Sequence, residues 1–381
     1  MPFRLLIIDD SPLYRLRLSQ ILSASDRLQL VGLAGDGREA IRLIGERKPE
    51  VVVLDLEMPG LDGLSVLRWT RAQAAPVPVV VCSGLAERES VFQALEAGAS
   101  DFMSKPELRF AVRSEAFARE LRARVEAAAE AHARPLDPAR GQDAAAVLAA
   151  TRFAHAAMSG GRRVRAIAVV GSAGGPAAVA RLVNELRPTL GAPVIFALHM
   201  PRGFTRSFAE RLSRQGRLDV REAEDGERLS ASPAWVAPGG QHTRVVRDSE
   251  GRLCLRVAPA GADSFCAPSA DRLLASVAAE FGAGALGVVL TGMGEDGREG
   301  ARAVRERGGT VIVESRDSAA VWGMPRAVLE AGHADAELSL SAIAAALPLL
   351  CERADSPQRH RRHRDDQRKC VEGELSDESR A

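Results

Sequence analysis

Val51-Val52-Val53-Leu54-Asp55 is a short apolar run that ends in an acidic residue, and Leu56-Glu57-Met58-Pro59-Gly60 follows it directly. Three neighbouring runs also end in polar groups: Leu5–Ile8 before Asp9-Asp10, Val79–Cys82 before Ser83, and Asp101–Met103 before Ser104-Lys105-Pro106. Short β-branched runs that alternate with helical patterns predict a parallel sheet. Since ligands of such sheets collect at the carboxyl ends of the strands, we expect these polar side chains to meet at one edge.

The residue types at this edge indicate phosphoryl chemistry. Three converging carboxylates, Asp9, Asp10 and Asp55, need a cation, and hard oxygen ligands suit Mg²⁺. A carboxylate beside such an ion can accept a phosphoryl group when a hydroxyl and an ammonium, here Ser83 and Lys105, lie close by. The sequence therefore predicts a phosphorylation switch.

The same residues carry a family resemblance that covers about 120 residues. The chain has Asp-Asp, then D-x-E-M-P-G-x-D-G from Asp55 to Gly63, then a small hydroxyl and Lys-Pro, each after an expected strand. This order resembles the response-regulator receiver domain, which implies a flavodoxin-like sheet of strand order 2-1-3-4-5. The resemblance implies Asp55 as the phosphoryl acceptor, and Asp9, Asp10, Asp55 and the backbone carbonyl of Glu57 as the Mg²⁺ ligands. It implies Ser83 and Lys105 as the contacts of the phosphoryl group, and Phe102 as the aromatic switch residue.

Length and composition place this domain in a larger protein. A chain of 381 residues predicts two domains, and a net charge of +1 gives no global attraction to nucleic acid or membranes. The start of the chain lacks a signal-peptide pattern and no apolar run reaches membrane-spanning length, so we expect a cytoplasmic protein without membrane insertion. The five cysteines are scattered without a CxxC pair, which favours reduced thiols over metal or disulfide roles.

Composition suggests the domain boundaries. We expect a receiver domain over 1–126, an Ala-, Arg- and Pro-rich linker over 127–162, a second α/β domain over 163–351 and a charged tail over 352–381. The tail joins a basic block to an acidic end, so a nucleic-acid tail is conceivable, but a solvated disordered tail is favoured.

The second domain repeats the pattern of apolar runs, and we expect it to be mostly parallel with a small antiparallel segment. Its expected strands are 165–171, 193–199, 234–238, 243–247, 253–258, 285–291 and 310–314, of which the middle three are expected to be antiparallel. An apolar helix is expected to close the domain near Cys351.

Three residues at the ends of these runs, or shortly after them, have the types that form the catalytic triad of a serine hydrolase. Ser172 lies in Gly171-Ser172-Ala173-Gly174-Gly175, His199 ends the run from Pro193, and Asp296 lies in the Gly-rich segment after 285–291. A serine hydroxyl needs a base, and the imidazole needs an acceptor that fixes its tautomer. The order Ser, His, Asp and the Val170 in place of the first glycine of a Gly-x-Ser-x-Gly elbow separate this arrangement from α/β-hydrolases.

Each member taken singly has another explanation. The glycine-rich loop fits a phosphate cradle nearly as well as a nucleophile turn. His199 alone could be a buried histidine with its hydrogen bonds satisfied, and Asp296 alone could be the N-cap of the helix that follows it.

The combination resembles the catalytic domain of the CheB-type chemotaxis protein-glutamate methylesterases, over residues 163–350. The resemblance rests on five stretches: 171–176, 199–212, Ala237–His242, Leu290–Gly297 and Gly323–Arg326. It implies Ser172 as nucleophile, His199 as base, Asp296 as its orienting partner and the Met293 backbone N–H as an oxyanion donor, with no cofactor in the esterase site. Ala173 departs from the family, in which many members have threonine at this position.

Together the two resemblances imply a phosphorylation-activated esterase of two-component chemotaxis signalling. It would hydrolyse glutamate γ-methyl esters on chemoreceptors to glutamate and methanol, and deamidate receptor glutamines. The expected partners are methyl-accepting chemoreceptors and a sensor histidine kinase, without nucleic acid. The alternatives are a DNA-binding output, which residues 163–350 do not favour because they lack a basic helix-turn-helix pattern, and a catalytically idle adaptor.

Overall fold

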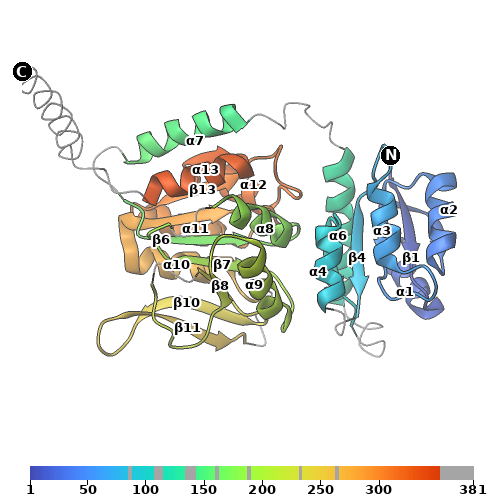
Figure 1. The fold of residues 1–381 in the computed structure, drawn as a ribbon, viewed down its shortest axis with the longest axis horizontal. Helices are drawn as coiled ribbons and strands as arrows, with labels where there is room; N and C mark the ends of the chain where they lie inside the picture. The colour runs from blue at the N-terminus through green and yellow to red at the C-terminus, as the bar shows by residue number, and fades with distance from the viewer. Residues whose placement is uncertain are drawn as a thin grey trace, which may run out of the picture.

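The computed structural model contains two α/β domains, each built on its own parallel sheet (Figure 1). The structure describes residues 1–84, 88–106, 115–133, 143–158, 163–186, 190–230, 234–261 and 266–351. The expected charged tail at 352–381 lies outside the described residues. Within the described part, no helix is at once long enough and apolar enough to cross a lipid bilayer.

The N-terminal sheet has five parallel strands in the order β2-β1-β3-β4-β5, as predicted. The strands are β1 (Phe3–Ile8), β2 (Leu28–Ala34), β3 (Val51–Leu54), β4 (Val79–Ser83) and β5 (Asp101–Ser104). The helices are α1 (Pro12–Leu22), α2 (Gly37–Arg47), α3 (Gly63–Arg71), α4 (Arg88–Glu96) and α6 (Glu115–Ala133). All four residues of β3 are buried, as expected of a central strand that is covered on both faces.

Local signals explain where the first helices begin. The Ser11 hydroxyl accepts a 3.4 Å hydrogen bond from the Tyr14 N–H, and Pro12 occupies the first helical position of α1. Asp36 and Asp62 cap α2 and α3 in the same way. These caps end each connecting loop close to the carboxyl edge of the sheet.

The C-terminal sheet has seven parallel strands in the order β14-β13-β12-β6-β7-β9-β8. The strands are β6 (Ala166–Gly171), β7 (Val194–Leu198), β8 (Val220–Glu222), β9 (Ala234–Val236), β12 (Ala285–Val289), β13 (Thr310–Glu314) and β14 (Ala336–Leu338). The helices are α8 (Gly175–Glu185), α9 (Phe204–Gln215), α10 (Ala270–Phe281), α11 (Arg298–Glu306), α12 (Met324–Glu330) and α13 (Leu340–Cys351).

The expected antiparallel segment is smaller than predicted. Among the strands of the described residues, β10 (Gln241–Arg247) and β11 (Leu253–Pro259) form the one antiparallel pair, whereas the expected strand at 234–238 was wrongly grouped with them. Its β9 part pairs in parallel with β7 and β8. The chain leaves the sheet after β9, where Gly239 packs so closely against Pro201 that an added Cβ would lie 2.4 Å from the Pro201 carbonyl oxygen. Although few residues separate β9 from β10, the two strands therefore do not form a β-hairpin.

The expected linker contains helical structure. Helix α6 continues to Ala133, and α7 (Asp143–Met158) packs against α13 of the C-terminal domain, with Ala150 and Ala154 buried. Alanine-rich sequence has high helix propensity and small side chains, which allow the two helices to pack closely. Helix α7 is therefore attached to the C-terminal domain rather than forming a free connection.

Candidate functional site

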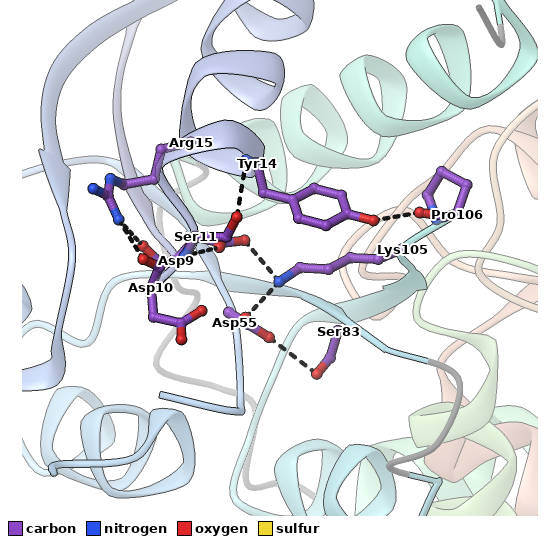
Figure 2. A network of polar contacts seen from close by, with 9 residues as sticks. All are labelled: Asp9, Asp10, Ser11, Tyr14, Arg15, Asp55, Ser83, Lys105 and Pro106. Carbon is purple, nitrogen blue, oxygen red and sulfur yellow. Dashed lines mark hydrogen bonds and ion pairs between the residues drawn. The ribbon is translucent and has the colours of Figure 1, made fainter. Parts of the chain in front are cut away.

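The acidic edge of the N-terminal domain brings together the side chains that follow β1 and β3 (Figure 2). Carboxylate oxygens of Asp9, Asp10 and Asp55 all lie within 4.8 Å of one another. Asp9 and Asp55 are buried, whereas Asp10 is exposed. This acidic cluster in a receiver-type fold is typical of a Mg²⁺ site, because the donor set consists of hard oxygens that surround one point.

Lys105 and Ser83 join the same cluster from the ends of β5 and β4. The Lys105 ammonium lies 2.7 Å from an Asp9 carboxylate oxygen and also forms an ion pair with Asp55. The Ser83 hydroxyl donates a 3.1 Å hydrogen bond to Asp55 Oδ1. The ammonium is also 4.8 Å from the centre of the Tyr14 ring, whose hydroxyl donates to the Pro106 carbonyl. The Asp55 carboxylate is therefore contacted by one cation, Lys105, and one hydroxyl, that of Ser83.

Burial and neighbouring charge oppose each other in this cluster. Burial raises the pKa of Asp9, and the nearby Lys105 offsets only part of this effect. Burial also disfavours the charged form of Lys105, but the charges of Asp55 and Asp9 outweigh it and raise the pKa of the ammonium. The lysine is therefore held as a cation beside the two buried carboxylates.

The second group of candidate residues follows three adjacent strands of the C-terminal sheet. Ser172 follows β6 and His199 follows β7, and the last residues of these strands pair directly, Gly171 with Leu198. Asp296 lies in the loop after β12, the other neighbour of β6. Parallel strand order therefore places the three residues at one edge of the sheet.

Ser172 lies in a tight turn from β6 into α8. Gly174 has φ of +73°, a conformation that glycine adopts without steric cost, and α8 begins at the next residue. The Ser172 N–H donates a 3.0 Å hydrogen bond to the Thr291 carbonyl, and the residue is only 6% exposed. Between Ser172 and His199 the structure contains no side-chain hydrogen bond, which is common in active sites without substrate.

His199 and Asp296 form a hydrogen-bonded pair, with 2.9 Å between His199 Nε2 and Asp296 Oδ2. Burial disfavours the charged imidazole, but the hydrogen bond to Asp296 and the charges of Asp296 and the nearby Cys266 raise the pKa of His199 to about 9. Burial likewise raises the pKa of Asp296, but His199 and the N–H groups of Asp271 and Ala270 lower it to about 2. Asp296 is therefore an ionised acceptor that orients the imidazole.

The Asp296 carboxylate is held by a helix other than its own. Its Oδ2 accepts from the Ala270 N–H at 2.8 Å, and its Oδ1 accepts from the Asp271 N–H at 3.0 Å and the Ser269 hydroxyl at 3.2 Å. These donors form the start of α10. The simple alternative, that Asp296 caps the helix after it, does not describe the structure, because the N-cap of α11 is Gly297 without a side-chain cap.

Met293 lies in the loop beside Ser172. A Cβ on the preceding Gly292 would lie 2.9 Å from the Ser172 backbone nitrogen, so the two loops pack in direct contact. Within the described residues the Met293 N–H makes no hydrogen bond. Its role as an oxyanion donor, which the family resemblance implies, stays a prediction.

Sequence reasoning missed two residues next to the triad. Cys266, interpreted there as one of five thiols without a role, is exposed and lies near enough to His199 to raise the pKa of the imidazole. His242, on the buried side of β10, accepts a 3.3 Å hydrogen bond from the Ser269 N–H. Both line a hollow of about 650 Å³ that also includes Asp296. No local pattern marks Cys266, because its contact with His199 arises only when two distant loops meet.

The receiver domain contacts the loops that carry Ser172 and His199. The Gly174 N–H, two residues after Ser172, lies near the buried carboxylate of Asp101 in β5 and lowers its pKa against the larger, opposite effect of burial. The Phe102 ring packs against Phe204, the first residue of α9, with 5.3 Å between ring centres. Helix α4 contacts α8 and α9, and Figure 1 shows α4 and α6 on the side of the N-terminal domain that faces the C-terminal domain. A cleft of about 950 Å³ is lined by α6 on one side and by Met293 and Trp322 on the other. The N-terminal domain thus lies against the candidate catalytic edge.

Comparison with known proteins gives two family matches and several relatives. A model described as CheB methylesterase matches residues 167–347, and one described as response regulator receiver domain matches residues 5–114. A protein-glutamate methylesterase/protein-glutamine glutaminase of Myxococcus xanthus is 42% identical, covering 91% of this chain and 97% of the relative. One of Anaeromyxobacter dehalogenans is 41% identical, covering 93% and 97%. The crystal structure of the Thermotoga maritima CheB methylesterase catalytic domain is 34% identical, covers 49% of this chain and 98% of that chain, and has a TM-score of 0.47.

Proposed function

Because the chain belongs to the family of receiver-linked protein-glutamate methylesterases/protein-glutamine glutaminases, we propose that it demethylates chemoreceptors through Ser172 under the control of phosphorylation at Asp55. The observation that carries this proposal is the contact between β5, which leads into Lys105 at the acidic cluster, and the two loops that present Ser172 and His199. One element thus touches both candidate sites.

The esterase step follows from the positions of three groups. His199, oriented by Asp296, takes the proton of the Ser172 hydroxyl as its oxygen attacks the ester carbonyl of a receptor glutamate γ-methyl ester. The backbone N–H of Met293 stabilises the oxyanion, and one such donor lowers the barrier by about 3 kcal/mol. His199 then returns the proton to the departing methanol, and water hydrolyses the acyl-enzyme to glutamate. The same steps on a glutamine amide release ammonia.

The receiver site contributes the control. Asp9, Asp10 and the backbone carbonyl of Glu57 would hold Mg²⁺, and Asp55 would accept a phosphoryl group from a sensor histidine kinase. Mg²⁺ when bound neutralises the added charge of the phosphoryl group. Ser83 and Lys105 would then contact the phosphoryl oxygens rather than the bare Asp55 carboxylate. Because β5 carries both Phe102 and the connection to Lys105, this rearrangement would loosen its contacts with Phe204 and Gly174.

The direct test of activity uses methylated chemoreceptor as substrate. The full-length protein should release methanol from receptor methyl esters, and ammonia from receptor glutamines with a mass increase of about 1 Da per site. The phosphodonor-treated protein should be faster in both reactions. A protein that binds the receptor and releases neither product, with or without phosphodonor, would contradict the proposed activity and favour an adaptor.

The pH dependence of the esterase should reflect His199. Burial lowers the pKa of His199, but Asp296 and Cys266 outweigh it and raise the pKa to about 9. The imidazole is therefore protonated at neutral pH and unable to act as a base. The value of kcat/KM should therefore rise roughly tenfold per pH unit below this pKa and level off near pH 9. Methanol release between pH 6 and 10 measures it, with the Ser172→Ala variant as the background. Half-maximal activity near pH 6.5 would contradict the assigned pKa.

Removing the receiver domain should raise the basal rate. A fragment that begins at residue 141 keeps α7, whose buried face packs on α13, and loses every receiver contact with Gly174 and Phe204. We expect at least a severalfold faster methanol release without phosphodonor, because receptor can reach the edge that carries Ser172. Circular dichroism checks that the fragment is folded. A folded fragment that is no faster than the unphosphorylated full-length protein would argue against occlusion.

A further inference from the structure

Two helices next to the catalytic pair exchange hydrogen bonds through two aspartates. Asp296, which precedes α11, accepts the N–H groups of Ala270 and Asp271 at the start of α10. Asp271, in the first turn of α10, accepts the N–H groups of Gly297 at 2.9 Å and Gly300 at 2.7 Å from the start of α11. Each aspartate therefore caps the other's helix, and the N–H groups at both helix starts, which lack partners within their own helices, are satisfied.

The backbone around this exchange leaves little room for another arrangement. Gly297 has φ of +105°, and a Cβ added at Gly300 would lie 2.9 Å from both Asp271 Cα and the Asp271 carbonyl oxygen. Glycine at both positions thus allows α11 to approach α10 closely enough for the Asp271 carboxylate to reach both N–H groups. Asp271 is half-buried, and burial together with the negative charge of Asp296 raises the pKa of its carboxyl group.

We propose that Asp271 is a positioning residue of the esterase, which holds the loop of Asp296 against α10 and thereby fixes the orientation of His199. The chain of contacts is short: Asp271 binds Gly297, Gly297 adjoins Asp296, and Asp296 binds His199 at 2.9 Å. Without the Asp271 side chain, two N–H groups at the start of α11 lose their shared acceptor and the Asp296 loop gains freedom. Small displacements of a catalytic group have large effects on rate, up to about a hundredfold for 1 Å. This inference rests on the proposed function, since it assigns a role within the same triad.

Two substitutions separate position from charge. Both accepted hydrogen bonds end on Asp271 Oδ1, so asparagine keeps a carbonyl oxygen for Gly297 and Gly300 while it loses the charge. Alanine loses both. In the full-length protein we expect Asp271→Ala to lower kcat about tenfold or more with little change in KM, and Asp271→Asn to stay within a few-fold of wild type. Asp248→Ala is the matched control, because Asp248 Oδ1 also accepts two backbone N–H groups, those of Glu250 and Arg252 at 2.9 Å, in the turn between β10 and β11.

The decisive readout is the titration of His199, followed by NMR of labelled histidine with His199→Gln for assignment. A displaced Asp296 stabilises the imidazolium less, so Asp271→Ala should lower the pKa of His199, whereas Asp248→Ala and Asp271→Asn should leave it near the wild-type value. If Asp271→Ala is poorly folded, Gly300→Ala tests the same approach of α11 to α10 and should shift the titration in the same direction. An unchanged His199 titration in the folded alanine variants overturns the positioning role. This readout needs no esterase activity, so it separates failure of this inference from failure of the proposed reaction.

Discussion

Replacing Ser172 by alanine should reduce methanol release from methylated receptor by roughly 10⁴-fold or more, because it removes the hydroxyl that we propose as the nucleophile. Ser172 is nearly buried in the turn between β6 and α8, and its backbone N–H is bonded to Thr291. Alanine keeps this backbone bond and deletes one oxygen, so stability should change little. Methanol release under saturating substrate, with and without phosphodonor, measures the effect.

The control for this variant is the receiver domain itself. Ser172 follows a strand of the C-terminal sheet, so its substitution leaves Asp55 and its contacts with Lys105 and Ser83 unaltered. The Ser172→Ala protein should therefore still accept a phosphoryl group at the wild-type rate. If the variant releases methanol at a rate comparable with wild type, the nucleophile has been assigned to the wrong residue.

Replacing Asp296 by asparagine should lower kcat by roughly 10³- to 10⁴-fold, since a neutral amide cannot hold the imidazole in the tautomer that accepts the serine proton. The structure adds a second reason. Both carboxylate oxygens of Asp296 accept hydrogen bonds, so one N–H of α10 would face the amide NH₂ instead of an acceptor. The acid limb of the pH profile should also move downward, because His199 loses the charge that raises its pKa.

Thermal unfolding and kinetics together separate the two effects of this substitution. Ser269→Ala removes one hydrogen bond to Asp296 Oδ1 and leaves the carboxylate in place, so it serves as the matched comparison. It should reduce kcat far less than Asp296→Asn. Equal losses of kcat in the two variants would show that the lost charge of Asp296 does not explain the lower activity of Asp296→Asn.

Much of this fold could be predicted because its signals are local. Runs such as Val51–Leu54 and Ala166–Gly171 are apolar throughout, which marks central parallel strands, and Ser11-Pro12 marks the start of α1. The polar residue after each run then lies at the carboxyl edge as a consequence of the parallel order. This is why Ser172, His199 and Asp296 could be grouped before their positions were known.

Features that arise from distant contacts could not be predicted in this way. The parallel pairing of β9 depends on where the chain leaves the sheet at Gly239, and the effect of Cys266 on the pKa of His199 arises where two separate loops meet. The stacking of Phe102 on Phe204 depends on how two domains pack. The exchange of caps between Asp271 and Asp296 also looks, in sequence, like two unrelated helix starts.

The central claim is that the charge state of Asp55 controls Ser172, and one comparison of rates tests it most directly. Methanol release from methylated receptor is measured with and without a small-molecule phosphodonor for the wild-type protein and for Asp55→Asn. Phosphodonor should stimulate the wild type, whereas Asp55→Asn should retain measurable basal activity and show no stimulation, because the acceptor carboxylate is gone while the triad is intact. Stimulation of the Asp55→Asn protein to the wild-type extent would contradict the coupling of the two sites.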